Sequence, residues 1–211
     1  MKIETRSEYK RGELHRRDLK PGPFDQFTLW FDEASRSGVL EPNAMSLATA
    51  GADARPLVRT VLLKNYDARG FVFYTNWESR KSRQIQENPH VALLFPWLAL
   101  ERQVIITGAA EKVSTAETLE YFITRPRGSQ IGAWVSAQSS IITSRKLLEA
   151  KWEEMKQKFA EGEVPVPPFW GGYRVVPREI EFWQGRASRL HDRFLYTRQP
   201  DDSWAINRLA P

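Results

Sequence analysis

The chain has no cysteine and only three histidines among its 211 residues. The lack of cysteine excludes a disulfide framework and a thiolate nucleophile, and so few histidines argue against a protein metal site. The GxGxxG, Walker A, HExxH and GxSxG motifs are also missing. No apolar run approaches the roughly 20 residues needed to span a bilayer. These absences exclude a Rossmann-type dinucleotide site, a P-loop, a zinc protease and an α/β-hydrolase.

Composition restricts the cellular compartment and the chemical class of the ligands. Residues 1–20 are polar and lack the apolar segment of a signal peptide. Together with the missing cysteine, this favours a reducing compartment, and we expect a cytoplasmic protein. The net charge of +5 and the pI near 9.5 fit either nucleic acid or phosphorylated small molecules as ligands. We expect most of the eight Trp and eleven Phe to fill a core and a subunit interface.

Residues 1–23 are predicted to form a mobile arm, because they are rich in Lys and Arg and end in Pro-Gly-Pro. The arm is either a disordered tail or a segment that folds over an anionic ligand, with Arg6 and Tyr9 as its contacts. Residues 24–211 show no internal repeat, low-complexity segment or linker, so we expect one domain.

Hydrophobic periodicity predicts a mainly β fold with helices, of the α+β class. Helices are expected at 24–37, 79–88, 115–124, 129–136 and 143–160, and strands at 45–50, 57–64, 71–75, 90–97 and 102–113. A loop rich in Pro and Gly covers 162–172, and the remaining tail is expected to form three or four strands. Strands joined by turns favour an antiparallel sheet that closes into a barrel. The 57–64 strand is apolar on both faces, so we expect it inside the sheet.

The first candidate site is the helix that follows the 71–75 strand. Ser79 is a good cap, which places Arg80 and Lys81 in the first turn. Two cations at the positive end of a helix dipole are favourable when an anion such as phosphate binds there. Arg59 and Lys64 bracket the apolar middle of the 57–64 strand and border either a ligand pocket or water. The alternative interpretation is an exposed basic turn.

A second candidate site is the junction between two helices. Pro126 ends the first helix at Arg125, and Ser129 is expected to cap the next one. Tyr121, Arg125 and Ser129 therefore gather around a helix N-terminus and suit a second anion. Each residue taken alone also fits a purely structural role.

The segment RLHDR at 189–193 is the third candidate site. In an extended strand Arg189, His191 and Arg193 share one face, where they repel each other unless an anion offsets them. His191 would then be a hydrogen-bond partner of the ligand or a proton shuttle. Alternatively, Asp192 or the backbone satisfies the histidine and both arginines are solvated.

Several ordered motifs together resemble the pyridoxamine 5′-phosphate oxidase family. The resemblance covers about residues 6–211 and rests on the segments RTVLLK, FYTN..SRK, LLFPW..LERQV, YF..RPR.SQIGAWVS.QSS, FWGG, FWQG....RLHDRF and RLAP. It implies a split β-barrel homodimer with two FMN molecules at the subunit interface. It also implies oxidation of pyridoxamine or pyridoxine 5′-phosphate to pyridoxal 5′-phosphate, the final step of its biosynthesis and salvage. O₂ would be the electron acceptor and hydrogen peroxide the second product.

The resemblance also implies residue roles. The FMN contacts would be Arg59, Thr60, Val61, Leu62, Leu63, Lys64, Tyr74, Thr75, Arg80, Lys81, Gln103, Gln138, Ser139, Trp183 and Arg193. The substrate contacts would be Lys64, Tyr121, Arg125 and Ser129 on the phosphate, Arg189 and His191 at the pyridine ring, and Arg6 and Tyr9 on the covering arm. Arg189 and His191 would be the catalytic pair, with no obligatory general base assigned.

The sequence departs from the family pattern at Trp77-Glu78, at Leu98-Ala99 and at Arg186-Ala187-Ser188. The last of these lies nearest the predicted site and leaves open the preference between amine and alcohol substrates. Three other functions fit part of the sequence: a flavin reductase that uses a nicotinamide donor, a nucleic-acid-binding barrel and a non-catalytic carrier of pyridoxal phosphate. The reductase would lack the 121–129 junction and RLHDR, and a nucleic-acid groove would spread its basic residues along its length.

Overall fold

The computed structural model describes residues 8–136 and 138–211, which form five helices, three short 3₁₀ turns and a nine-stranded antiparallel sheet. The strands are β1 Ala44–Ala50, β2 Pro56–Leu62, β3 Asn65–Asp67, β4 Gly70–Asn76, β5 His90–Trp97, β6 Arg102–Lys112, β7 Trp170–Gln184, β8 Asp192–Arg198 and β9 Trp204–Leu209. The helices are α1 Pro23–Arg36, α2 Arg80–Glu87, α3 Thr115–Thr124, α4 Arg127–Val135 and α5 Arg145–Lys158. The 3₁₀ turns are Arg16–Asp18, Leu98–Leu100 and Ala187–Arg189.

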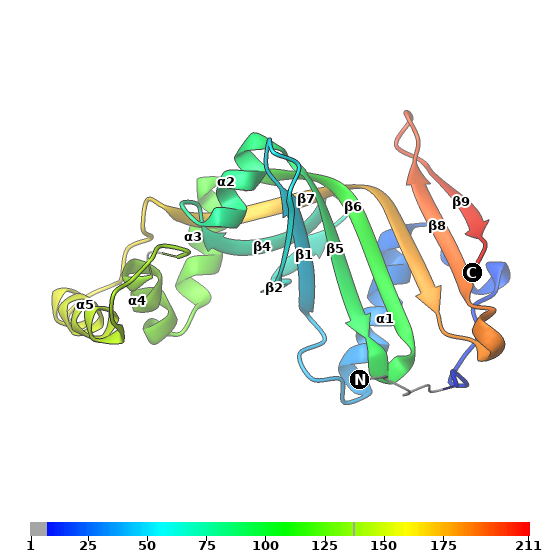
Figure 1. Ribbon diagram of the computed structural model, residues 1–211, viewed down its shortest axis with the longest axis horizontal. Helices are drawn as coiled ribbons and strands as arrows, with labels where there is room; N and C mark the ends of the chain where they lie inside the picture. Colours follow the sequence, from blue (N-terminus) through cyan, green and yellow to red (C-terminus); the bar gives the residue numbers. More distant parts are fainter. Residues whose placement is uncertain (1–7, 137) are drawn as a thin grey trace.

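The sheet curls so far that the two ends of its strand order meet. The order is β2-β1-β5-β6-β7-β4-β3, and β8 and β9 extend from the second half of β7. Only Leu63 and Lys64 separate the end of β2 from the start of β3, although these strands stand at opposite ends of that order. The curl is visible in Figure 1. It places Lys64 at the seam of the sheet and confirms the expected α+β fold with a barrel-like sheet.

The prediction that the 57–64 strand lies inside the sheet is wrong for the single chain. Within the described residues β2 pairs only with β1, and Val58 is 66% exposed. Val61 and Leu62 are only half-buried. An apolar pattern on both faces indicates burial, but it does not say which surface provides the burial.

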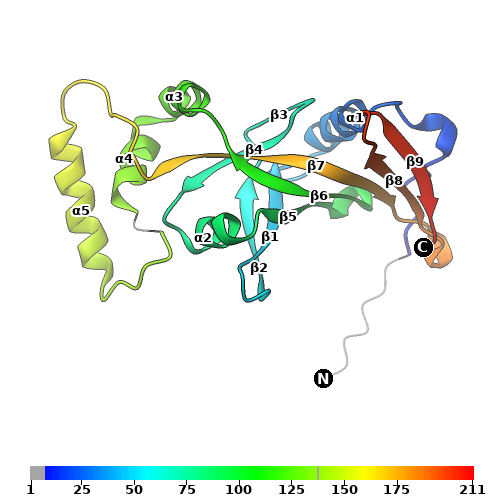
Figure 2. The same cartoon turned by 90° about the horizontal axis from the view of Figure 1, so that it is seen from above.

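The main core lies between α1 and the concave side of the sheet. Phe27 of α1 is fully buried, and its ring contacts those of Phe71, Phe95 and Trp97 at centroid distances of 4.9, 5.0 and 6.0 Å. Figures 1 and 2 show α1 against one side of the strands. The expected role of the aromatic residues in a core is therefore confirmed. A second, smaller core joins α4 and α5 to the start of β7.

Local sequence signals set most helix boundaries. Ser79 caps α2, and Ser114 forms a capping box with Glu117 at the start of α3. Arg125 is extended before Pro126, as expected, so α3 ends there. The prediction that Ser129 caps α4 is wrong. Pro126 is the N-cap residue and Ser129 lies in the first turn, because α4 begins directly after the proline.

The tail forms three strands, and β7 starts at Trp170, inside the segment that was predicted to be a loop. The β8–β9 hairpin turns at residues 199–203, as expected. The prediction of an extended RLHDR segment is wrong in its first half. Ser188 and Arg189 have φ values of 54° and 61° in a 3₁₀ turn, and β8 begins only at Asp192. No helix among the described residues is long and apolar enough to cross a membrane.

Candidate functional site

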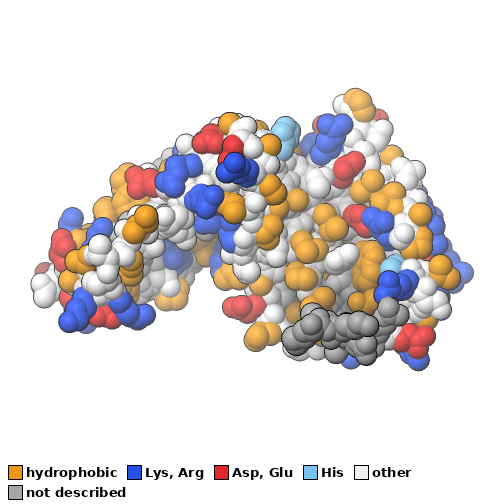
Figure 3. All heavy atoms as spheres, in the orientation of Figure 1, with side chains coloured by type: hydrophobic (Ala, Val, Ile, Leu, Met, Phe, Trp, Pro, Cys, Tyr) orange, Lys and Arg blue, Asp and Glu red, His pale blue; other side chains and the backbone are white. Residues whose placement is uncertain are grey.

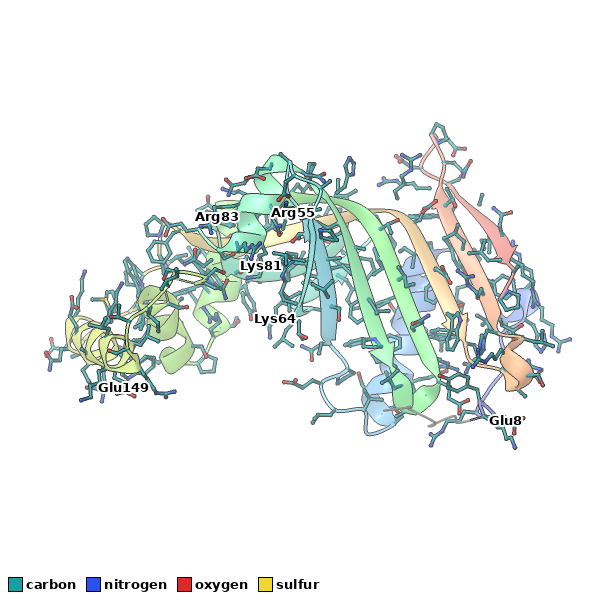
Figure 4. The ribbon with its side chains drawn as sticks, in the orientation of Figure 1. Glu8, Arg55, Lys64, Lys81, Arg83 and Glu149 are labelled. Atoms are coloured by element: carbon teal, nitrogen blue, oxygen red, sulfur yellow. The ribbon has the colours of Figure 1, made fainter. Side chains whose placement is uncertain are left out.

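A cavity of about 740 Å³ opens where β2, β4, α2, α3 and α4 meet. It brings together most of the predicted ligand contacts of the first and second candidate sites. Its lining consists of Arg59, Thr60, Val61, Leu62, Lys64, Tyr74, Thr75, Arg80, Lys81, Tyr121, Thr124, Arg125, Pro126, Ser129, Gln138, Ser139 and Trp170. Figure 4 shows Lys64 and Lys81 on the same side of the sheet, facing α3 and α4.

Lys81 is the most buried cation of this cavity, with an exposed fraction of 8%. Its Nζ donates to Gln138 Oε1 at 2.7 Å and to Thr75 Oγ1 at 3.0 Å, and the Thr75 hydroxyl donates to the same Gln138 oxygen. Burial, together with the charge of Arg59, lowers the pKa of Lys81 to about 8. Among the residues that the structure describes, the ammonium therefore has neutral partners only, and a bound anion would stabilise its charged form.

Arg59 reaches into the sheet from β2. Its guanidinium donates to Thr49 Oγ1 at 2.6 Å and to Leu47 O at 3.1 Å. Burial and the positive charge of Arg80 lower the pKa of Arg59. Arg80 is the first residue of α2, as predicted, so its charge adds to the positive end of the helix dipole. Positive groups from two elements therefore converge on one wall of the cavity.

The opposite wall is the α3–α4 junction. The Arg125 guanidinium lies 4.6 Å from the ring centre of Trp170, and its buried NH1 has no hydrogen-bond partner among the described residues. The Tyr121 ring stacks on Tyr74 with centroids 4.0 Å apart. Burial raises the pKa of both phenols, that of Tyr74 to about 12, so their hydroxyl groups remain protonated donors. The Tyr74 hydroxyl donates to Glu117 O, so this wall offers an anion the Arg125 NH1 and the Tyr121 hydroxyl.

The charge of the cavity is of one sign. Its described lining residues include the cations Arg59, Lys64, Arg80, Lys81 and Arg125 and no carboxylate. Figure 3 shows Lys and Arg side chains gathered over α2 and the adjoining strands. Such a density of uncompensated charge is unfavourable in a free protein and suits a ligand with more than one anionic group.

One predicted cofactor contact faces away from the cavity, and three others lie elsewhere in the sheet. Leu63 is 5% exposed and belongs to the main core. Gln103 of β6, Trp183 of β7 and Arg193 of β8 stand side by side across three paired strands. Arg193 forms a bidentate ion pair with Glu181, with Nε 2.7 Å from Oε1, and its NH1 donates to Ala210 O.

The predicted catalytic pair lies next to this row. The His191 ring is 4.6 Å from that of Trp183, and Tyr9 packs edge-on against both rings. The backbone N–H of Arg186 donates to His191 Nδ1 at 3.1 Å. Burial and the charge of Arg189 lower the pKa of His191. The ring is therefore held neutral, with its proton on Nε2.

The chain thus carries two groups of predicted site residues at two places. Figures 1 and 2 show β8 and the turn before it at one end of the sheet, with α3 and α4 beyond the other end. We call the cavity the phosphate half-site, and the row with Tyr9, Arg189 and His191 the ring half-site. The structure does not bring the two half-sites together within one chain. Arg6 lies outside the described residues.

Sequence reasoning missed three lining residues: Thr124, Pro126 and Trp170. Trp170 belongs to the segment FWGG, which was noted as a motif but given no role. A Cβ on Gly172 would lie 2.7 Å from Val113 Cγ2 and 2.9 Å from Tyr74 Cε1. Only glycine therefore lets Tyr74 lie flat against β7 beside Trp170. The glycine pair of the FWGG motif is therefore the sequence feature that indicates this close packing.

Family comparisons cover most of the chain. A family model described as "Pyridoxamine 5'-phosphate oxidase" matches residues 31–159. A second, described as "Pyridoxine 5'-phosphate oxidase C-terminal dimerisation region", matches residues 170–211. The ring half-site residues Trp183, Arg189, His191 and Arg193 all lie in this second match.

Curated relatives match over nearly their full length. Proteins named pyridoxine/pyridoxamine 5'-phosphate oxidase from Crocosphaera subtropica and Aliarcobacter butzleri are 64% and 58% identical, each over 98% of this chain and 97% of the relative. A crystal structure of PhzG from Burkholderia lata 383, in complex with tetrahydrophenazine-1-carboxylic acid, is 31% identical. It aligns over 92% of this chain and 95% of that chain with a TM-score of 0.87. An FMN-binding protein from Nostoc punctiforme, 17% identical over 92% of this chain and 100% of that chain with a TM-score of 0.73, shares the fold.

Proposed function

This chain belongs to the pyridoxamine 5′-phosphate oxidase family, and from that premise we propose that it oxidises pyridoxamine or pyridoxine 5′-phosphate to pyridoxal 5′-phosphate. The cofactor is FMN, the electron acceptor is O₂, and the second product is hydrogen peroxide. The active unit is a homodimer, in keeping with the dimerisation region matched at residues 170–211.

The observation that carries the proposal is the cavity with five cations and no carboxylate among its described lining residues. FMN and the substrate each carry one phosphate group, so both together require a site for two phosphates. The cavity has two positive walls, one at the start of α2 and one at the α3–α4 junction. A site for a single neutral ligand would not need this charge density.

The wall at α2 fits the phosphate of FMN. The first turn of α2 has backbone N–H groups without helical partners, and the side chains of Arg80 and Lys81 stand in the same turn. The Lys81 ammonium contacts only neutral oxygens, those of Thr75, Ser79 and Gln138. A phosphate here would give it the counter-charge that residues 8–136 and 138–211 do not supply.

The wall at the α3–α4 junction fits the substrate phosphate. The unpartnered NH1 of Arg125 is a buried donor that needs an acceptor, and a phosphate oxygen supplies one. Tyr121 and Ser129 contribute hydroxyl groups to the same lining, and Lys64 stands at the seam of the sheet. The two phosphates would then lie on facing walls of one cavity.

The ring half-site of a second copy completes the site in this proposal. Gln103, Trp183 and Arg193 would border the flavin, while Arg189 and His191 would meet the pyridine ring. Tyr9 already packs on His191 and would cover the ring from the arm. The proposal explains why both half-sites remain half-exposed in one chain. It also explains why four residues of the ring half-site, Trp183, Arg189, His191 and Arg193, lie within the matched dimerisation region.

The chain's own residues bind and orient in this scheme. The chemistry supplied by bound FMN is the acceptance of a hydride from the substrate carbon that bears the amine or hydroxyl, followed by oxidation by O₂. Arg189 places a planar cation against the pyridine ring and aligns the reacting carbon. His191 accepts from Arg186 N at Nδ1, so it offers Nε2–H as a donor to the substrate. In this tautomer and geometry His191 holds the substrate.

The colour of the protein provides the test. Purified protein is expected to be yellow, or to become yellow when FMN is added, and to bleach when pyridoxine 5′-phosphate is added without O₂. Admission of O₂ should restore the colour and release hydrogen peroxide. Protein that takes up no FMN would contradict the proposal, and bleaching only by a reduced nicotinamide would indicate a reductase instead.

A further inference from the structure

A buried arginine joins two elements that carry the substrate-phosphate contacts. Arg174 of β7 is 3% exposed. Its NH1 lies 3.0 Å from Asp67 Oδ1, and its NH2 lies 2.6 Å from Glu117 Oε1. The two nitrogens of one guanidinium thus bind two carboxylates from different elements, which is a geometry that the single ammonium of lysine does not reproduce.

The two carboxylates belong to segments that are far apart in sequence. Asp67 closes the β3–β4 hairpin, where it pairs with Gly70, and Lys64 stands just before β3. Glu117 lies in the first turn of α3, one helical turn before Tyr121. Lys64 and Tyr121 both line the cavity. The Arg174 bridge therefore connects the Lys64 side of the phosphate half-site to the α3 side.

Apart from the stacking of Tyr121 on Tyr74 and the contact of Phe122 with Trp170, helix α3 has few other anchors among the described residues. Of its ten residues only Thr118 and Phe122 are buried. The hydroxyl of Tyr74 donates to Glu117 O at 3.2 Å. Most of the helix surface faces solvent, so apolar packing alone fixes its position weakly. A forked ion pair from the buried Arg174 guanidinium to the first turn of α3 therefore contributes to setting where Tyr121 and Arg125 stand.

We propose that Arg174 is a positioning residue for the substrate phosphate: its bridge between Asp67 and Glu117 holds α3 at the distance from Lys64 that a phosphate group requires. This inference rests on the proposed function and adds to it a residue that does not line the cavity. Arg174 acts through Lys64 and Tyr121, and it confers selectivity for substrates that carry a phosphate.

Arg69 provides a matched control. It is bonded to the same two carboxylates, with its NH2 2.7 Å from Asp67 Oδ2 and 3.1 Å from Glu117 Oε1. Its side chain is 63% exposed, whereas that of Arg174 is 4% exposed. Exposed ion pairs contribute little, because water and salt screen them. The substitutions Arg174→Gln and Arg69→Gln therefore remove the same charge from the same pair of acids at two depths.

The experiment measures kcat and KM with pyridoxine 5′-phosphate, the dissociation constant of FMN, and amide hydrogen exchange over α3. For Arg174→Gln we expect KM to rise by about tenfold or more, since small displacements of a binding group are costly. Its kcat and FMN affinity should stay within about twofold, and exchange over α3 should accelerate relative to α2. Arg69→Gln should leave all four quantities within about twofold of wild type. Arg174→Lys should raise KM less than Arg174→Gln does, but still above the wild-type value.

The inference is overturned if Arg174→Gln keeps the wild-type KM, or if it weakens FMN binding as much as substrate binding. Glu117→Gln is measured in parallel in case Arg174→Gln does not fold, because glutamine keeps the capping position and removes one end of the bridge. It should raise KM in the same way, and an unchanged KM would also overturn the inference. Wild-type protein that never oxidises pyridoxine 5′-phosphate would instead refute the proposed function, while α3 exchange would still report on the bridge.

Discussion

A site made from two copies predicts an unusual result when two inactive variants are combined. Arg125→Ala removes a contact of the phosphate half-site, and Arg189→Ala removes one of the ring half-site. Each variant alone forms dimers in which both sites lack one group. In a mixed dimer one site receives both damaged halves and the other receives both intact halves, so about half of the wild-type turnover per dimer should return.

The assay uses two affinity tags on co-expressed chains, so that only mixed dimers are purified, and measures kcat per bound FMN. The control places both substitutions in one chain and pairs that chain with wild type. Each site of this control dimer then contains one damaged half, and it should be nearly inactive. If each chain contained a complete site, the two results would be exchanged. That exchange would refute the split site.

Three further predictions follow from individual residues. Burial and the charge of Arg59 lower the pKa of Lys81 to about 8, so its ammonium is lost as the pH rises through that value. FMN affinity, measured by fluorescence titration, should fall as the pH rises above about 8, while the FMN-free protein gains stability from this group between about pH 8 and pH 10.5, because the unfolded chain binds the proton more tightly. Lys81→Arg should flatten the affinity profile, and an unchanged slope would contradict this role. Arg189→Ala should reduce turnover far more than FMN affinity, and an equal loss of both would refute the orienting role. Phe27→Ala should lower the free energy of unfolding in denaturant titrations by about 3–5 kcal/mol, because the ring is fully buried among other rings. A loss below about 1 kcal/mol would show that the core adapts.

The parts of the fold that the sequence predicted well are those with local causes. Ser79 caps α2 through a bond that its own segment supplies, so the first-turn position of Arg80 and Lys81 could be stated in advance. The strand at 90–97 was predicted with its observed bounds because alternation and flanking turns mark it. The extended state of Arg125 before Pro126 has an equally local steric cause.

The parts that could not be predicted depend on distant contacts. Alternation at 189–193 suggested a strand, but the Arg186 backbone bond to His191 Nδ1 and the positive φ of Arg189 belong to a turn with no strong sequence signal. The role of Arg174 was also invisible, since an arginine within an apolar strand does not reveal its partners. The position of β2 in the sheet follows from pairing over the whole chain.

The misplaced β2 strand and the divided site share one explanation. The apolar faces of β2 predicted a strand inside the sheet, yet β2 is an edge strand and Val58 is exposed in the single chain. Arg125 NH1 likewise lacks an acceptor among the described residues. Trp183 is not among the residues that line the cavity with Lys81. Each feature is left incomplete among the described residues of a single chain. In the proposed dimer, whose interface would include residues 170–211, a second ring half-site would lie at each phosphate half-site, and the association that covers the apolar strand would also complete the proposed site.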